Sequence, residues 1–98
     1  MKFGRKAKPE SPAEMAAVNH ALESPIRRRM LILMNQGHLS VKEISESVGP
    51  NMLDYHLNRL VLAGLIDVKD GTITLTEAGK AYGELVKAQS EMGGADKM

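Results

Sequence analysis

Residues 40–75 read SVKEISESVGPNMLDYHLNRLVLAGLIDVKDGTITL, and this stretch decides the fold. At its start Ser40 and Glu43 form an S-x-x-E capping box, in which the serine hydroxyl accepts a hydrogen bond from a backbone amide of the first helical turn. The box predicts a short helix over 40–48. Gly49 ends that helix, because glycine readily takes the left-handed conformation found after helices.

A second helix and a hairpin follow directly. Apolar residues at helical spacing predict a helix over 51–63, which ends at Gly64. Residues 65–69 and 72–75 are strand-like, and the Asp-Gly pair between them is a strong signal for a tight turn. The stretch therefore predicts a short helix, a turn, a second helix and a two-stranded hairpin.

Further helices are predicted on both sides of this stretch. Apolar positions at helical spacing predict a first helix over 13–22, and Ser24-Pro25 supplies the N-cap and first-turn proline of a helix over 25–36. Thr76 caps a last helix that reaches residue 92. The predicted fold class is mainly α with a small β-hairpin, in the order α-α-α-α-β-β-α.

This order describes a winged helix-turn-helix, in which the second helix of the pair enters the major groove of DNA. The segments ALESPIRRRMLILMNQGHLSVKEISESVG (21–49) and YHLNRLVLAGLI (55–66), with LTEAG (75–79), resemble the ArsR-type family of winged-helix transcriptional regulators. The resemblance implies a homodimer that binds duplex DNA in a sequence-specific manner. Winged helices also serve as protein-contact modules, so an adaptor that uses the outer face of helix 51–63 is the alternative.

The family's metal chemistry is not expected in this chain. Thiolate metal sensors of the family carry cysteines where Ser40 and Lys42 stand, and the chain has no cysteine. Its three histidines, His20, His38 and His56, share no ligand spacing, and the last helix contains none. We therefore expect neither a metal nor a cofactor, and the sequence identifies no effector. His56 is expected to pack at the edge of the buried face of its helix.

The outer face of helix 51–63 is the predicted DNA-reading surface. At 100° per residue, one face carries the side chains that point inward: Leu53, Leu57, Leu60, Val61 and Gly64. The predicted base and groove contacts are Asn51, Met52, Tyr55, Asn58 and Arg59. The predicted phosphate contacts are Lys42, Lys69, Lys2, Arg5, Lys6 and Lys8. Met52, Tyr55 and Leu62 make the same face apolar enough to suit a protein partner.

An acid in the first turn of a helix meant for DNA requires an explanation. With Asn51 as the N-cap, Asp54 falls at the third helical position, where its carboxylate can reach back to a free amide and meets the positive end of the helix dipole. A structural cap is the first interpretation. The alternative is that Asp54 accepts a hydrogen bond from cytosine N4.

Charge divides the chain unevenly. Residues 1–12 hold four bases and one acid, whereas the remainder is net −2. We interpret 1–12 as a basic flexible arm, 13–92 as the winged helix-turn-helix domain and 93–98 as a disordered tail. Because residues 40–71 hold three bases and five acids, the arm and Arg27–Arg29 are expected to supply much of the phosphate neutralisation. A helix spreads these three consecutive arginines over about 200°, so at least one of them is expected to cover the edge of the core instead.

The first and last helices are expected to make the dimer, as the resemblance implies. Gly79 and Gly83 lie four positions apart, and each costs a helix about 1 kcal/mol relative to alanine, so close approach of another helix is the expected compensation. The predicted dimer residues are Val18, Leu22, Tyr82, Gly83, Leu85 and Val86. The alternative is that both helices only cover their own core.

Other classes of protein are not supported. The sequence has no nucleophile and base pair, no Gly-rich phosphate loop and no metal-ligand set, so we do not expect an enzyme. The longest apolar run, Met30 to Met34, is far short of the roughly 20 residues of a membrane span. The basic N-terminus lacks the apolar segment of a secretory signal, and we expect a cytoplasmic protein.

Overall fold

The computed structural model of the chain describes residues 12–96, with side chains as far as Glu91. It is mainly helical with a two-stranded antiparallel hairpin, and the predicted order of elements is confirmed. The elements are α1 (Pro12–Ala21), α2 (Pro25–Asn35), α3 (Val41–Val48), α4 (Leu53–Leu62), β1 (Ile66–Lys69), β2 (Thr72–Leu75) and α5 (Glu77–Asp96).

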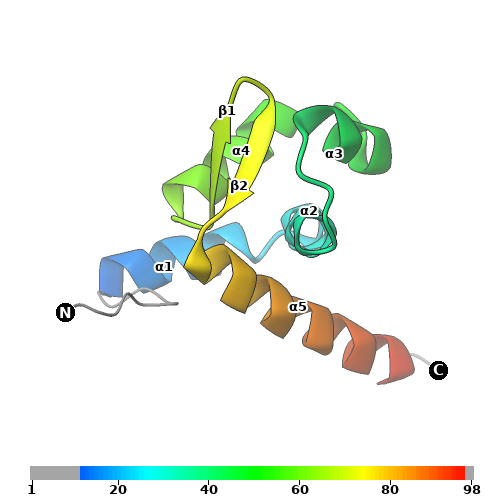
Figure 1. Ribbon diagram of the computed structural model, residues 1–98. Coiled ribbons are helices and arrows are strands. Elements are labelled where there is room, and N and C mark those ends of the chain that lie inside the picture. The colour runs from blue at the N-terminus through cyan, green and yellow to red at the C-terminus, as the bar shows by residue number, and fades with distance from the viewer. Residues whose placement is uncertain (1–11, 97–98) are drawn as a thin grey trace.

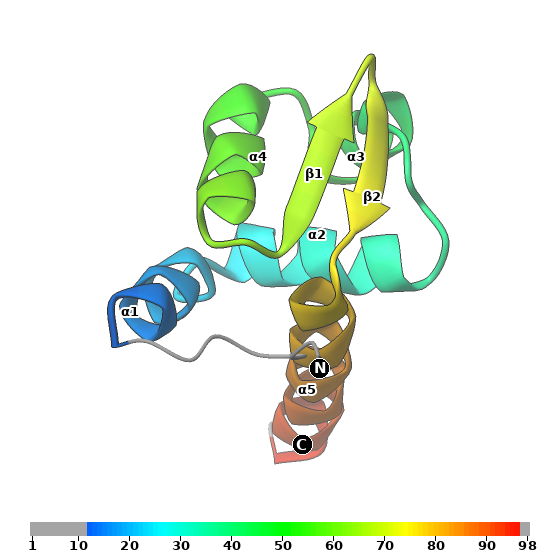
Figure 2. The same cartoon turned by 60° about the vertical axis from the view of Figure 1, so that its left-hand side comes forward.

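Helix α2 is the centre of the molecule. The hairpin, α3 and α4 lie on one side of it, and α5 lies on the other side and points away from the body (Figure 1; Figure 2). The largest fully buried side chains include Met30, Leu31 and Met34 of α2. On α4 the inward residues Leu53, Leu57 and Leu60 are buried as predicted. Between residues 12 and 96, no helix is both long and apolar enough to cross a membrane.

Three of the helices start with a side-chain N-cap, as the sequence predicts. Ser24 Oγ accepts from the Arg27 amide at 3.3 Å at the start of α2, and Ser40 Oγ accepts from the Glu43 amide at 3.0 Å at the start of α3. Thr76 Oγ1 accepts from the amide of Gly79 at 3.0 Å in the first turn of α5. Each bond satisfies an amide that has no partner within its own helix. Helix α5 is longer than predicted, so the tail expected from residue 93 is helical as far as Asp96.

The hairpin is fixed by its turn and by the segment before α3. Asp70 and Gly71 have φ values of +52° and +77°, the left-handed pair that a two-residue hairpin turn requires. The register pairs Lys69 with Thr72 next to this turn. The amide of Ile73 also donates to the carbonyl of Leu39 at 2.8 Å, which holds the start of α3 against β2.

Candidate nucleic-acid interface

Helix α4 presents one exposed face that is continuous along its length. Met52, Tyr55 and Leu62 are 56%, 48% and 68% exposed, which is high for large apolar side chains. Asn51 and Asn58 are exposed as well, and Arg59 is half-buried. Gly64 is exposed rather than buried, because it follows the helix in a left-handed conformation with φ +78°. Ala63 is buried in its vicinity instead.

The start of α4 differs from the prediction. Met52, and not Asn51, is the N-cap residue, and it has the left-handed φ of +59° and ψ of +24°. The predicted cap was wrong because the amide of Leu53 already bonds to the carbonyl of Pro50 at 3.2 Å, so the chain still turns at Asn51. No side chain caps the first turn.

Asp54 consequently lies one position earlier in α4 than predicted. It is exposed in the first turn, and its side chain makes no hydrogen bond or ion pair within the described residues. The expected bond from its carboxylate back to a free amide is therefore absent from this part of the chain. Its position near the positive end of the helix dipole is as expected.

A buried arginine connects α4 to the two preceding helices. Arg27 is only 6% exposed. Its Nε donates to the carbonyl of Ala21 at 2.6 Å, and its Nη2 donates to the carbonyl of His20 at 3.4 Å. Both carbonyls belong to the last turn of α1, where the helix dipole favours a cation. Its third contact, at 3.0 Å, joins Nη1 to Nδ1 of His56.

The chemistry of the Arg27 side chain fixes the state of His56. A guanidinium group has only donors, so Nδ1 of His56 must accept, and the proton of the neutral imidazole must lie on Nε2. Partial burial and the charge of Arg27 both lower the pKa of His56 from its usual value. The imidazole is therefore neutral at pH 7. Besides the expected packing, His56 accepts a hydrogen bond from Arg27, which its position in the sequence did not indicate.

Two guanidinium groups lie near the ring of Tyr55. The Cζ atom of Arg27 is 5.8 Å from the centroid of the tyrosine ring, and that of Arg59 is 6.0 Å from it. Cations at this distance are attracted by the face of an aromatic ring. The ring of His56 also lies 5.6 Å from that of Tyr55 at a tilted angle. Tyr55 is therefore oriented by charged neighbours although it is half exposed.

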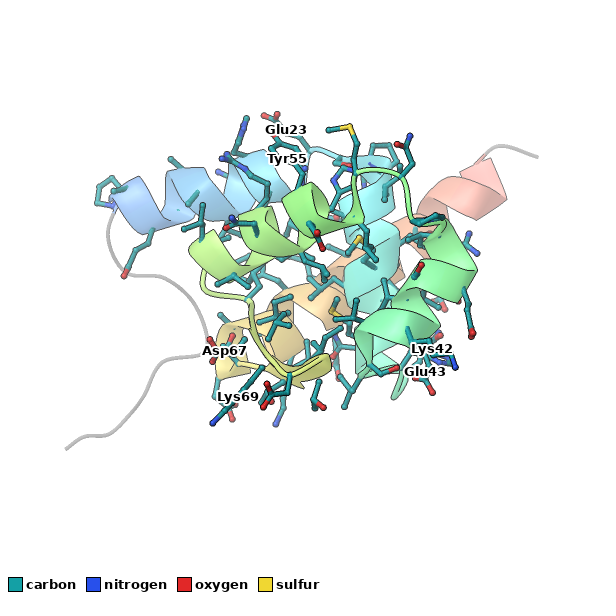
Figure 3. All side chains as sticks on the ribbon, turned by 90° about the horizontal axis from the view of Figure 1, so that it is seen from above. Glu23, Lys42, Glu43, Tyr55, Asp67 and Lys69 are labelled. Atoms are coloured by element: carbon teal, nitrogen blue, oxygen red, sulfur yellow. The ribbon has the colours of Figure 1, made fainter. Side chains whose placement is uncertain are left out.

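The two other bases between residues 40 and 71 lie away from Tyr55. Lys42 on α3 and Lys69 on the hairpin are exposed, and in the view of Figure 3 they lie on the opposite side of α4 from Tyr55. The five acids between residues 40 and 71 are exposed too: Glu43, Glu46, Asp54, Asp67 and Asp70. The predicted phosphate contacts Lys2, Arg5, Lys6 and Lys8 lie outside the described residues.

The three consecutive arginines have separate environments. Arg27 is buried, so the expectation that it neutralises phosphate is corrected. Arg28 Nη1 donates to the carbonyls of Leu22 and Glu23 at 2.8 and 3.1 Å. Arg29 is exposed and lines a groove beside α5. Successive residues of a helix point about 100° apart, which explains why three neighbours differ this much.

The groove beside α5 has a volume of about 1060 Å³ and is lined by α1, α2 and α5. Four of the predicted dimer residues line it: Leu22, Tyr82, Leu85 and Val86. Leu85 and Ile26, which also lines the groove, are 51% and 43% exposed. These apolar side chains give the groove an open hydrophobic edge.

The other two predicted dimer residues lie inside the chain's own fold. Val18 is 1% exposed in the core. Gly83 faces Asn35 of α2, and an added Cβ would overlap with the side-chain amide. An added Cβ at Gly79 would overlap with the carbonyl oxygen of Leu65. The close approach that these glycines permit is therefore to their own chain, and the interpretation that they mark a second copy is corrected.

The described residues contain no group of three metal-ligating side chains. Two other histidines have acidic neighbours: His20 lies 3.6 Å from Glu23, and His38 lies 3.7 Å from Glu43. No protein-family model matches the chain, and no curated protein or solved structure matches it either.

Proposed function

We propose that the chain is a winged-helix protein that binds duplex DNA as a homodimer and regulates transcription without catalysis. The observation that carries the proposal is the exposed face of α4, where the donors of Tyr55, Asn58 and Arg59 lie together. An α-helix fits the major groove, and arginine and asparagine are the side chains that pair with guanine and adenine edges there. In this proposal the hairpin that follows α4 serves as the wing.

The charge distribution gives the N-terminal residues a large part in this proposal. The unit from residue 40 to 71 is net −2, and two of the three consecutive arginines are engaged by carbonyl groups. Phosphate contacts then come from Lys42 and Lys69 and from the basic first dozen residues. Affinity for DNA depends strongly on such contacts, so removal of residues 1–11 should flatten its dependence on salt.

The groove beside α5 is the proposed homodimer surface. Its apolar edge, with Ile26 and Leu85 exposed, suits burial against the same edge of a second copy, since a two-fold axis brings like surfaces together. Dimeric binding would place two α4 helices at half-sites one helical turn of DNA apart.

The protein-adaptor alternative is favoured by one observation. Met52, Tyr55 and Leu62 expose a large apolar area on a unit that carries net negative charge. Interfaces between proteins are rich in methionine and tyrosine, whereas DNA-binding surfaces are usually basic.

In vitro selection from a random duplex library, followed by fluorescence anisotropy of the recovered duplexes, tests the DNA proposal. We expect a defined sequence to be enriched, and Arg59→Ala to cost about 1–3 kcal/mol of binding free energy if Arg59 pairs with guanine. Lys80→Ala is the matched control, because Lys80 is an exposed base on α5. Recovery of no preferred sequence, with no affinity for pooled duplex at low salt, would contradict the proposal and leave the adaptor.

A further inference from the structure

Arg27 and His56 form a buried contact between three helices that the proposed reading of DNA does not itself require. Arg27 belongs to α2, holds the end of α1 through two carbonyls and reaches α4 through His56. The same guanidinium lies near the ring of Tyr55, the residue next to His56. A side chain of α2 thus lies close to both His56 and Tyr55 on α4.

The contact requires a neutral imidazole. Once Nδ1 is protonated it has no lone pair to accept from Arg27, and two cations face each other where a hydrogen bond of 3.0 Å had been. Arg27 stays in place, because it is buried and its two bonds to α1 do not depend on His56. The half-buried His56 is the partner free to move.

The first turn of α4 is the part of the helix least able to resist this movement. It has no side-chain cap, and it begins at Met52 in a left-handed conformation. The amide of His56 donates to the carbonyl of Met52, one of the first bonds of the helix. Displacement of His56 therefore acts directly on the turn that carries Met52 and Tyr55.

The other charged groups around His56 do not neutralise an added proton. From α2, Arg27 faces it and Arg28 bonds to carbonyls before that helix. From α1 and its following turn come His20 and Glu23, which lie 3.6 Å from each other and are both exposed. On α4 itself, the exposed Asp54 precedes it, and Arg59 adds a further positive charge one turn on. In the view of Figure 3, Asp67 and Lys69 of β1 lie away from Tyr55, across α4.

We propose that Arg27 and His56 form a pH-sensitive latch, in which protonation of His56 releases Tyr55 and weakens binding of duplex DNA. The effect on DNA rests on the proposed function, whereas the release of Tyr55 does not. The direction of the expected pH effect on DNA affinity distinguishes the latch from simple charge attraction. Protonation of a histidine ordinarily strengthens binding to a polyanion, but opening this latch weakens it.

Nuclear magnetic resonance of the DNA-free chain tests the latch itself. With the imidazole and tyrosine rings labelled, we expect the pKa of His56 to lie below the usual value of a histidine, and the Tyr55 ring signals to shift with the midpoint of His56. The Tyr55 signals are assigned with Tyr55→Phe, because the chain has only two tyrosines. A Tyr55 signal that does not follow the titration of His56 overturns the latch.

Fluorescence anisotropy with a labelled duplex from the selection tests the consequence. Between about pH 7.5 and pH 5, we expect the affinity of the parent chain to fall by about fivefold or more, a common size for coupling between two sites. In His56→Asn the side-chain oxygen retains an acceptor for Arg27 without titrating, so the affinity should not fall. His20→Gln and His38→Gln are the matched controls and should behave as the parent.

The two experiments distinguish failure of the latch from failure of the proposed function. An equal pH dependence in the parent and in His56→Asn, or tighter binding of the parent on acidification, overturns the coupling to DNA. If no duplex binds at any pH, the proposed function fails, and the DNA-free titration of the parent chain still decides the latch. That titration needs no variant of His56, so it holds even if His56→Asn does not fold.

Discussion

Met52 holds the backbone conformation on which the start of α4 depends. A left-handed conformation costs a residue with a side chain about 1–2 kcal/mol, and here it falls on a methionine that is 56% exposed. Its side chain makes no compensating contact with the core, which does not include it. An exposed, strained residue at this place is consistent with the proposed interface, because backbone strain is often found at binding sites.

Replacement of Met52 by glycine should therefore stabilise the fold and weaken binding. Glycine adopts the left-handed conformation without steric cost, so Met52→Gly should raise the free energy of unfolding by about 1 kcal/mol. Met52→Ala retains the backbone cost and is the control for loss of the side chain. Chemical denaturation measures the first effect and anisotropy the second. A glycine variant no more stable than the alanine variant would contradict the assignment of strain to Met52.

Single residues were the least predictable part of the site. Arg27 and His56 lie 29 positions apart, and no local spacing signals that a buried guanidinium will reach an imidazole on another helix. Arginine is rarely buried, so the run of three was expected to contribute to phosphate neutralisation. Because a helix spreads consecutive residues around its axis, at least one of the three was expected to cover the edge of the core instead, but the sequence did not indicate which one.

At the level of elements, the sequence was informative where local chemistry decides. Ser24, Ser40 and Thr76 each cap a helix as predicted, because a hydroxyl at that position bonds to an amide only a few residues away. The predicted N-cap of α4 was wrong, because nothing in the local sequence indicated that Met52 adopts a left-handed conformation. The glycines of α5 were recognised as points of close approach, but sequence could not identify which helix approaches.

The partners of those glycines now give opposite expectations for two similar substitutions. Gly79→Ala forces Cβ against a backbone carbonyl, so it should destabilise the fold by about 1–3 kcal/mol. Gly83→Ala meets only the side chain of Asn35, which can rotate at the cost of its bonds to the carbonyls of Leu31 and Gly79. The gain in helix propensity of about 1 kcal/mol offsets much of that cost.

A double-mutant cycle measured by chemical denaturation checks this account. In an Asn35→Ala background the obstacle is gone, so Gly83→Ala should become stabilising by about 1 kcal/mol. If Gly83→Ala is equally costly with and without Asn35, the close contact of Gly83 is not the one described. A second copy of the chain would then be its better explanation.

For the whole molecule, the groove beside α5 and the face of α4 have different characters. The groove combines exposed leucine and isoleucine side chains, whereas the α4 face combines polar donors with apolar ones. Periodicity predicted both surfaces, because it identifies which residues of a helix point away from the core. It could not place them relative to each other, since that depends on how α2 separates the hairpin side from α5.

A charge placed in the groove should separate the proposed dimer. Leu85→Glu introduces a carboxylate that would be buried without a partner in the dimer, whereas it is solvated in the monomer. Ala88→Glu makes the same change of charge on an exposed position of α5 outside the groove lining and should remain dimeric. Sedimentation velocity distinguishes the two. A parent chain that sediments as a monomer, or a Leu85→Glu variant that stays dimeric, would remove the groove from the interface.

Amide chemical-shift mapping on addition of duplex DNA reports where on the chain the duplex binds. We predict that the amides of Met52, Tyr55, Asn58 and Arg59 shift, together with those at the hairpin tip. The amides that line the α5 groove should shift far less. Shifts confined to the groove, or no shift at low salt with an equimolar duplex, would contradict the assignment of the α4 face to DNA.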